Sequence, residues 1–256
     1  MNPILTLAPI PKLESFDSYL FIGPHPDDIE VGAGGLVSKL VSAGKRVTFL
    51  IVTDGGSGSS DPNADINQVV ETRSLEVQQS ATLLGVSEVY ELGLPDGGEY
   101  LEIEAAKKIA RIILEENPDV IVAPDPKLPS EVHPDHLKTG SAAQTAMLMA
   151  AYPLMARRNH IPTDVAHFRD RTIAFYYTHR ANSWVELSDV DLVKRSASIR
   201  AHASQFQTEE TLMQILGYLQ MRGKQMGARI GKEEAEGYFV MAPVHQHSFP
   251  EINEAM

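Results

Sequence analysis

The chain of 256 residues has the length of one large α/β domain or two small ones. Hydrophobic residues make up 43% of it, enough for a sizeable core, which argues against intrinsic disorder. The formal net charge of -12 argues against general binding to nucleic acids or anionic membranes, since both depend on Lys and Arg. The chain has no cysteine, so disulfides and cysteine-bound zinc are excluded, and any metal must be held by His and carboxylates.

The first residues, MNPILTLAPIPKLESFD, lack the basic region and apolar run of a signal peptide. No apolar stretch approaches the roughly 20 residues that a membrane-spanning helix needs. We therefore expect a cytoplasmic protein with neither a membrane nor a nucleic acid as its partner.

Short apolar runs alternate with amphipathic helical patterns through the first 150 residues. The apolar runs predict buried strands at 19–23, 46–52, 88–92 and 119–124. The helical patterns predict one helix that ends near Gly44 and others over 68–84, 103–116 and 134–150. This order implies right-handed crossovers and a mostly parallel sheet covered on both faces. The predicted fold class is α/β, a Rossmann-like three-layer sandwich.

The C-terminal part continues with predicted strands at 172–178 and 238–242 and predicted helices at 189–206 and 209–226. No linker rich in Gly, Pro or Ser and no internal repeat separates it from the rest. We therefore expect a single domain over residues 1–256, with a core at about 19–150 and a smaller C-terminal extension at about 170–245.

Four polar loops follow the predicted parallel strands, at 23–35, 53–67, 93–100 and 124–135. They contain the segments PHPDD, TDGGSGSSD, LPDGG and PKLPSEVHPDH. Ligands of open α/β sheets bind beyond the carboxyl ends of the strands, so the four loops are expected on one rim. The sequence thus predicts a ligand site there.

A metal site explains the residue types of two of these loops. A catalytic zinc usually has three protein ligands and one open position. His25 and Asp28, three residues apart, can aim at one point from a tight turn. Pro134 is suited to the first position of a helix, which places His133 at the cap and His136 within the first turn. The predicted ligands are His25, Asp28 and His136, with zinc preferred and another divalent metal as the alternative.

The neighbours of these ligands suggest acid–base chemistry. Asp27 stands beside the metal and can take a proton from metal-activated water. His133, as a cation, can stabilise an oxyanion and protonate a leaving amine, while Asp135 orients it and favours its charge. The implied reaction is hydrolysis of an amide or ester. Either motif alone is more often a turn or helix cap, but both on one rim favour the metal site.

The segments PHPDDIEVGAGG, VTDGGSGS and VHPDH resemble the signature segments of the LmbE/PIG-L family of zinc-dependent N-acetylglucosamine deacetylases. The segments ETRSLEVQQSATLLGV, LGLPDGG and RAHASQF are also similar to family segments, so the resemblance runs from about Tyr19 to about Phe206. It implies hydrolysis of a small N-acetylated sugar and assembly into trimers or hexamers. It also implies the same zinc ligands, with Asp27 as the base and His133, backed by Asp135, as the stabiliser.

The resemblance further places Arg73 and Asp96 near the substrate sugar. The alternatives are a solvated helix residue for Arg73 and a turn former for Asp96, since Pro95-Asp96-Gly97 is a strong turn signal. His179 follows the predicted strand 172–178 at the rim and is a further candidate substrate contact.

Several points stay open at the level of sequence. Many family members have Glu directly after the aspartate pair, whereas here the acid is Glu30, for which helix capping is one alternative. His245 and His247 lie in an expected tail where metal binding would be adventitious. The glycines of 32–35 lack the spacing of a dinucleotide-binding loop, which argues against a dehydrogenase. A hydrolase of a non-sugar amide or ester, and a non-catalytic sugar-binding relative, remain competing interpretations.

Overall fold

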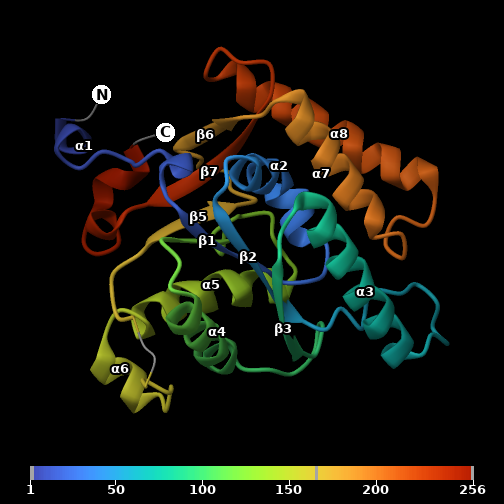
Figure 1. Cartoon of the computed structure of the whole chain (residues 1–256), viewed down its shortest axis with the longest axis horizontal. Coiled ribbons are helices and arrows are strands. Elements are labelled where there is room, and N and C mark those ends of the chain that lie inside the picture. Colours follow the sequence, from blue (N-terminus) through green and yellow to red (C-terminus); the bar gives the residue numbers. More distant parts are fainter. Residues whose placement is uncertain (1–2, 165–166, 255–256) are drawn as a thin grey trace. The chain divides into compact units, whose positions relative to one another are not determined.

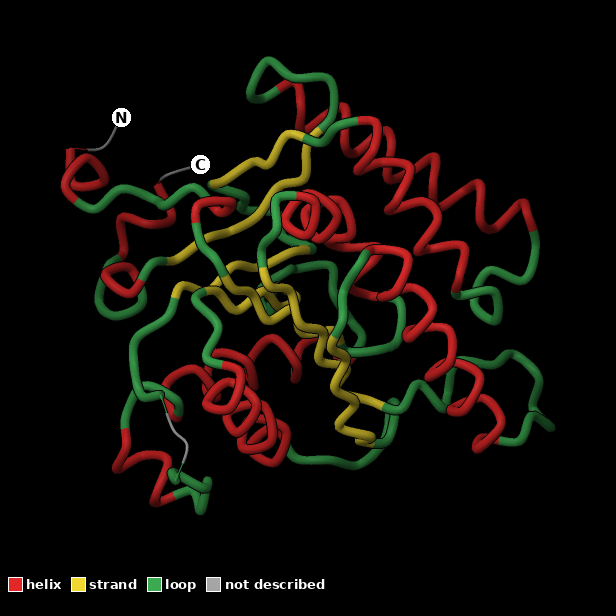
Figure 2. The backbone as a smooth tube through the Cα atoms, viewed as in Figure 1, coloured by secondary structure: helices red, strands yellow, loops and turns green. Residues whose placement is uncertain are grey.

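Two compact units make up the chain, each assembled from segments that are distant in the sequence. The computed structural model describes residues 3–164 and 167–254 (Figures 1 and 2). The first unit comprises Met1–Ile22, Tyr100–Ser183 and Gly237–Met256, and the second comprises Gly23–Glu99 and Trp184–Glu236. Over the described ranges, no helix combines the length and the hydropathy needed to cross a membrane. The single domain stays a prediction.

The sheet of the first unit is built on β4 (Val120–Pro124), which lies between β1 (Ser18–Gly23) and β5 (Thr172–Tyr176). Both neighbours run parallel to β4, and β7 (Ala235–Met241) pairs with β5 in the antiparallel direction. All residues of β1, β4 and β5 are buried. Continuous apolar burial is typical of parallel strands that are covered on both faces.

The helices of the first unit include α4 (Glu102–Glu116) and α5 (Pro134–Met149), which pack side by side (Figure 1). A Cβ at Gly140 of α5 would lie 2.5 Å from the carbonyl oxygen of Pro124, so the missing side chain lets α5 approach the end of β4. The shorter elements are α1 (Pro3–Leu7), α6 (Pro153–Arg158) and the 3-10 turns Leu13–Ser15, Pro243–His245 and Pro250–Glu254.

His245 corrects the expectation of a loose histidine tail. It is 3% exposed, and its Nε2 lies 2.9 Å from the Ala8 carbonyl oxygen, while its Nδ1 accepts the Ala242 N–H. His245 therefore joins the two terminal segments of the first unit, whereas His247 is exposed.

The second unit contains the parallel pair β2 (Arg46–Thr53) and β3 (Glu88–Leu94). Helices α2 (Asp28–Ser42), α3 (Ile66–Leu84) and α7 (Asp189–Ala201) pack against one another, as Figure 1 shows. β6 (Ser183–Glu186) precedes α7, and α8 (Glu209–Ala228) follows it. Ile199, Leu212 and Leu219 form a small buried cluster between α7 and α8.

Most predicted strands and helices are confirmed within a few residues, with two corrections. The expected loop 23–35 is a helix from Asp28 onward, and its glycines allow close packing: a Cβ at Gly35 would lie 2.5 Å from Leu187. The expected helix 189–206 ends at Ala201. There the chain turns, because the His202 carbonyl accepts the N–H groups of Gln205 and Phe206.

Gly140→Ala is expected to destabilise the fold by roughly 1–3 kcal/mol, because the new methyl group meets the rigid backbone at the end of β4. Gly217→Ala is the matched control, since it also replaces a helical glycine but meets nothing within 4 Å. It is expected to be neutral or to stabilise by up to about 1 kcal/mol through helix propensity. Urea unfolding of both variants measures the difference, and equal effects would contradict the close approach of α5 to β4.

Candidate active site

The predicted site residues divide between the two units, and most of them lie in the turns and helix starts that follow parallel strands, while Arg73 lies within α3. The second unit holds His25, Asp27, Asp28, Arg73 and Asp96, and the first unit holds His133, Asp135, His136 and His179.

The turn between β1 and α2 brings His25 and Asp28 together. Nδ1 of His25 lies 3.0 Å from Oδ2 of Asp28, and the same oxygen accepts the His25 backbone N–H at 3.1 Å. Both residues are buried, with exposed fractions of 8% and 7%. Asp28 is also the first residue of α2, where the helix dipole favours a negative charge. The two residues therefore converge, as their three-residue spacing predicts.

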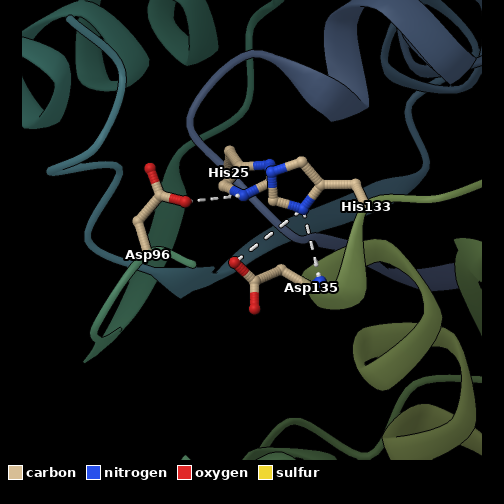
Figure 3. A group of neighbouring side chains, drawn as sticks. All are labelled: His25, Asp96, His133 and Asp135. Carbon is tan, nitrogen blue, oxygen red and sulfur yellow. Dashed lines mark hydrogen bonds and ion pairs between the residues drawn. The ribbon is translucent and has the colours of Figure 1, made fainter. Parts of the chain in front are cut away.

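The turn after β3 brings a second carboxylate to the same imidazole. Oδ1 of Asp96 lies 3.1 Å from Nε2 of His25 (Figure 3), and Oδ2 accepts the Ser57 N–H at 3.1 Å. Burial alone would raise the pKa of Asp96, but the hydrogen bond and charge of His25, with Ser57 and Arg73, hold that pKa below its ordinary value. His25 thus has a carboxylate at each ring nitrogen, a crowding of negative charge that a cation would relieve.

Arg73 joins the turn before α2 to the loop after β2. It is 3% exposed, and it donates to the carbonyl oxygens of Pro26 at 2.8 Å and Gly55 at 3.0 Å. A Cβ at Gly58 would lie 2.4 Å from Nη1, so the glycine-rich loop packs directly on the guanidinium. The solvated alternative for Arg73 is therefore wrong, and its contact with the substrate stays a prediction.

Asp27 combines a strained backbone with a perturbed carboxyl group. Its φ of 132° lies in a region that residues with a Cβ rarely adopt, and such strain is concentrated at functional sites. Its side chain is 19% exposed and lies 3.4 Å from Arg73 Nη2. Burial, followed by the charge of Asp28, raises the pKa of Asp27 from 3.8 to about 7, while Arg73 acts in the opposite direction. In the metal-free chain this carboxyl group exchanges its proton near neutral pH.

Glu30, whose role the sequence leaves open, is completely buried and links three helical segments. Its Oε1 accepts a hydrogen bond from Ser80 of α3 and lies 3.1 Å from Nε2 of His202, at the end of α7. Burial would lower the pKa of His202, but the charge and hydrogen bond of Glu30 outweigh it and raise that pKa. Gln205, three residues further on, donates to the Gly58 carbonyl at 3.1 Å. The RAHASQF segment thus supports the loop that packs on Arg73.

In the first unit, the HPDH segment begins α5 as predicted. His133 is the N-cap, Pro134 is the first helical residue, and Nδ1 of His133 accepts the Asp135 N–H at 3.3 Å. The Asp135 carboxylate is fully buried, and its Oδ2 lies 3.9 Å from the same nitrogen, too far for a hydrogen bond (Figure 3). The His133 side chain is 43% exposed.

His136, in the first turn of α5, has two neighbours that the sequence interpretation missed. Oε2 of Glu131 lies 3.1 Å from Nδ1 of His136, and the ring of Tyr177 stacks on the imidazole at 6.0 Å between centroids. The signal for Glu131 is an acid two residues before the HPDH segment. Nothing local marks Tyr177, which follows β5 with a positive φ of 51°.

The loop after β5 is tied to the end of β4 through Asp125. Its carboxylate accepts hydrogen bonds from Thr178 at 2.7 Å and from Arg180 at 2.9 Å. His179 lies between these two anchors and is exposed. Its role as a substrate contact stays a prediction.

Comparison with known proteins identifies the chain. The family model PIG-L, described as GlcNAc-PI de-N-acetylase, matches residues 20–147. A diacetylchitobiose deacetylase of Thermococcus kodakarensis is 35% identical over 231 residues, covering 90% of this chain and 85% of the relative. The chain belongs to the PIG-L family.

Solved structures agree with this assignment. The N,N'-diacetylchitobiose deacetylase of Pyrococcus horikoshii, solved with an inhibitor, has a TM-score of 0.84 and 32% identity, and the match covers 93% of this chain and 88% of that one. A 4-carboxy-2-hydroxymuconate hydratase of Pseudomonas putida, at 19% identity, has a TM-score of 0.74 over 89% and 97% of the two chains, which shows the fold alone. The α/β fold class, a three-layer sandwich with a mostly parallel sheet, is confirmed.

The raised pKa of Asp27 predicts how the stability of the metal-free PIG-L chain changes with pH. The folded state holds this proton more tightly than the unfolded state, so the stabilisation is complete below about pH 4 and is lost as the pH rises through about 7. Asp27→Asn removes this pH-dependent contribution. Between pH 4.5 and 7.5, the free energy of unfolding of wild type should therefore fall by roughly 1–3 kcal/mol more than that of the variant.

Urea unfolding in the presence of chelator measures this difference at several pH values. Asp61→Asn, at an exposed aspartate, is the control and should follow wild type throughout. Parallel pH profiles for wild type and Asp27→Asn would show that Asp27 titrates with an ordinary pKa.

Proposed function

We propose that this PIG-L protein is a metal-dependent hydrolase that removes the acetyl group from an N-acetylglucosamine-type sugar. The observation that carries the proposal is the strained turn of the second unit, where His25 has carboxylates at both ring nitrogens and Asp27 adjoins them. The similarity to the Thermococcus diacetylchitobiose deacetylase over 90% of the chain supports the choice of substrate class.

In this proposal His25, Asp28 and His136 hold a zinc ion, with another divalent metal as the alternative. Imidazole nitrogen and carboxylate oxygen suit zinc, and three protein ligands leave a position open for substrate and water. The buried carboxylates of Asp28 and Asp96 around His25 fit a cation chemically. The bound metal would polarise the acetamide carbonyl and lower the pKa of water to roughly 7.

The side chains around this site would divide the proton transfers. Asp27 takes the proton of the attacking water, a task that suits a carboxylate directly beside the ligand Asp28, with Arg73 3.4 Å away. His133 stabilises the oxygen that becomes negative and then protonates the leaving amine, and Asp135, buried 3.9 Å from its Nδ1, helps to orient the ring.

Arg73, Asp96 and His179 are the proposed contacts of the sugar. Asp96 is held ionised and can accept a hydrogen bond from a hydroxyl group. The cytoplasmic location and the assembly into trimers or hexamers stay predictions alongside this proposal.

An amine-release assay tests the reaction class. With zinc present, N,N'-diacetylchitobiose and simple N-acetylglucosamine glycosides should release acetate and a free amine, and excess chelator should abolish the release. Small acetate esters and N-acetylated amino acids distinguish the alternative hydrolases. Turnover of only these compounds would contradict the sugar substrate, and no turnover by the zinc-loaded protein would favour the non-catalytic alternative.

Two substitutions separate the base from a ligand. Asp27→Asn should keep the bound zinc while lowering kcat by roughly 10²–10⁴-fold, the usual contribution of a general base. His136→Ala should remove most of the zinc. Metal analysis beside steady-state kinetics measures both effects. Undiminished kcat in Asp27→Asn would exclude Asp27 as the base, and full zinc content in His136→Ala would exclude His136 as a ligand.

A further inference from the structure

Glu131 contacts both histidines of the HPDH segment through the two oxygens of one carboxylate. Oε1 accepts the backbone N–H of His133 at 2.8 Å, and Oε2 lies 3.1 Å from Nδ1 of His136. The side chains of Glu131 and His136 are 17% and 15% exposed, so solvent screens this contact only in part. Glu131 thus lies just before α5 and holds both its N-cap and its first turn.

We propose that Glu131 is the positioning residue of His136, fixing the tautomer in which Nδ1 carries the proton and Nε2 is left for the metal. The inference rests on the proposed function, which makes His136 a zinc ligand. Histidine ligands of metals usually donate their other ring N–H to a carboxylate or carbonyl, and loss of that partner costs roughly 10–100-fold in metal affinity.

The negative charge of a carboxylate at Glu131 determines which ring nitrogen of His136 carries the proton. An ionised carboxylate only accepts hydrogen bonds, so a close contact with Nδ1 is favourable only when that nitrogen carries a proton. The lone pair of the neutral imidazole then lies on Nε2, across the ring. Oε2 of Glu131 lies 3.1 Å from Nδ1 of His136, close enough to favour a proton on that nitrogen.

Two further contacts make this arrangement more than a loose surface ion pair. The Tyr177 ring stacks on His136 with an interplanar angle of 14°, which restrains the plane of the imidazole. The Glu131 N–H donates to the Leu128 carbonyl at 3.1 Å, which fixes the backbone that carries the carboxylate. Both the His136 ring and the loop that carries Glu131 are therefore restrained. A single contact between them can then favour one tautomer of His136.

Zinc affinity, measured by competition with a chromophoric chelator, tests the inference. Glu131→Ala should weaken zinc binding roughly 10–100-fold while still reaching one zinc per chain at saturation. Glu131→Gln keeps an acceptor oxygen and should recover most of the affinity. Glu104→Ala, at an exposed glutamate of α4, is the matched control and should bind as wild type does.

Long-range ¹H–¹⁵N spectra of the metal-free protein give a second measurement, independent of zinc and of activity. His136 of wild type should carry its proton on Nδ1, and Glu131→Ala should shift the population toward Nε2–H. A wild-type Nε2–H tautomer would overturn the inference even if Glu131→Ala does not fold.

The metal site and the role of Glu131 can be refuted separately. Wild type that binds no zinc, or His136→Ala that binds it normally, would overturn the metal site itself. Normal behaviour of both, with Glu131→Ala within threefold of wild-type affinity, would overturn the role of Glu131 alone.

Discussion

The concentration of negative charge around His25 is the constraint on which the second unit depends. Asp28 and Asp96 contact opposite nitrogens of this imidazole, and Asp27 is the next residue to Asp28. Carboxylates that are withdrawn from water repel one another unless a positive charge or hydrogen-bond donors compensate for them. Arg73 supplies part of the compensation from within the chain, and a divalent cation would supply the rest. The groups that hold these side chains in place form a frame around the turn between β1 and α2.

That frame is built from groups that have little freedom to relax. Arg73 is held by two backbone carbonyls, and Gly58 of the loop beside it has no room for a side chain. The buried Glu30–His202 pair joins α2 to the end of α7. A buried pair of this kind is costly to break, because the remaining charge loses its partner. The backbone strain at Asp27 can therefore persist, since the surrounding helices determine the path of the turn.

The sequence predicted all strands but β6, the helix start at Pro134 and the convergence of His25 with Asp28, because each has a local signal. Alternation of apolar and polar runs, proline at a helix start and close spacing of ligand types are all readable within a few residues. The role of Glu30 was not readable, because its partners Ser80 and His202 are 50 and 172 residues away in the chain. The start of α2 at Asp28 was missed for a similar reason, since the glycines near it suggest a loop until their close packing is known. Glu131 belongs to the loop 124–135 at the predicted rim, but its contact with His136 depends on the turn between the two residues, which the sequence does not show.

The fold alone does not decide the reaction, since a hydratase has the same fold at 19% identity. The chemistry depends instead on the different surroundings of Asp27 and Asp28, two neighbouring carboxylates in one turn. Asp28 points an oxygen at the N–H and ring of His25, an arrangement that holds the oxygen in place as a ligand requires. Asp27, the preceding residue, makes no side-chain cap bond to α2, and its Oδ2 lies 3.4 Å from Nη2 of Arg73. Without a metal, its pKa is raised to about 7. Adjacent carboxylates with such different surroundings are suited to different tasks: one fixed in position to bind, the other able to gain and lose a proton at neutral pH.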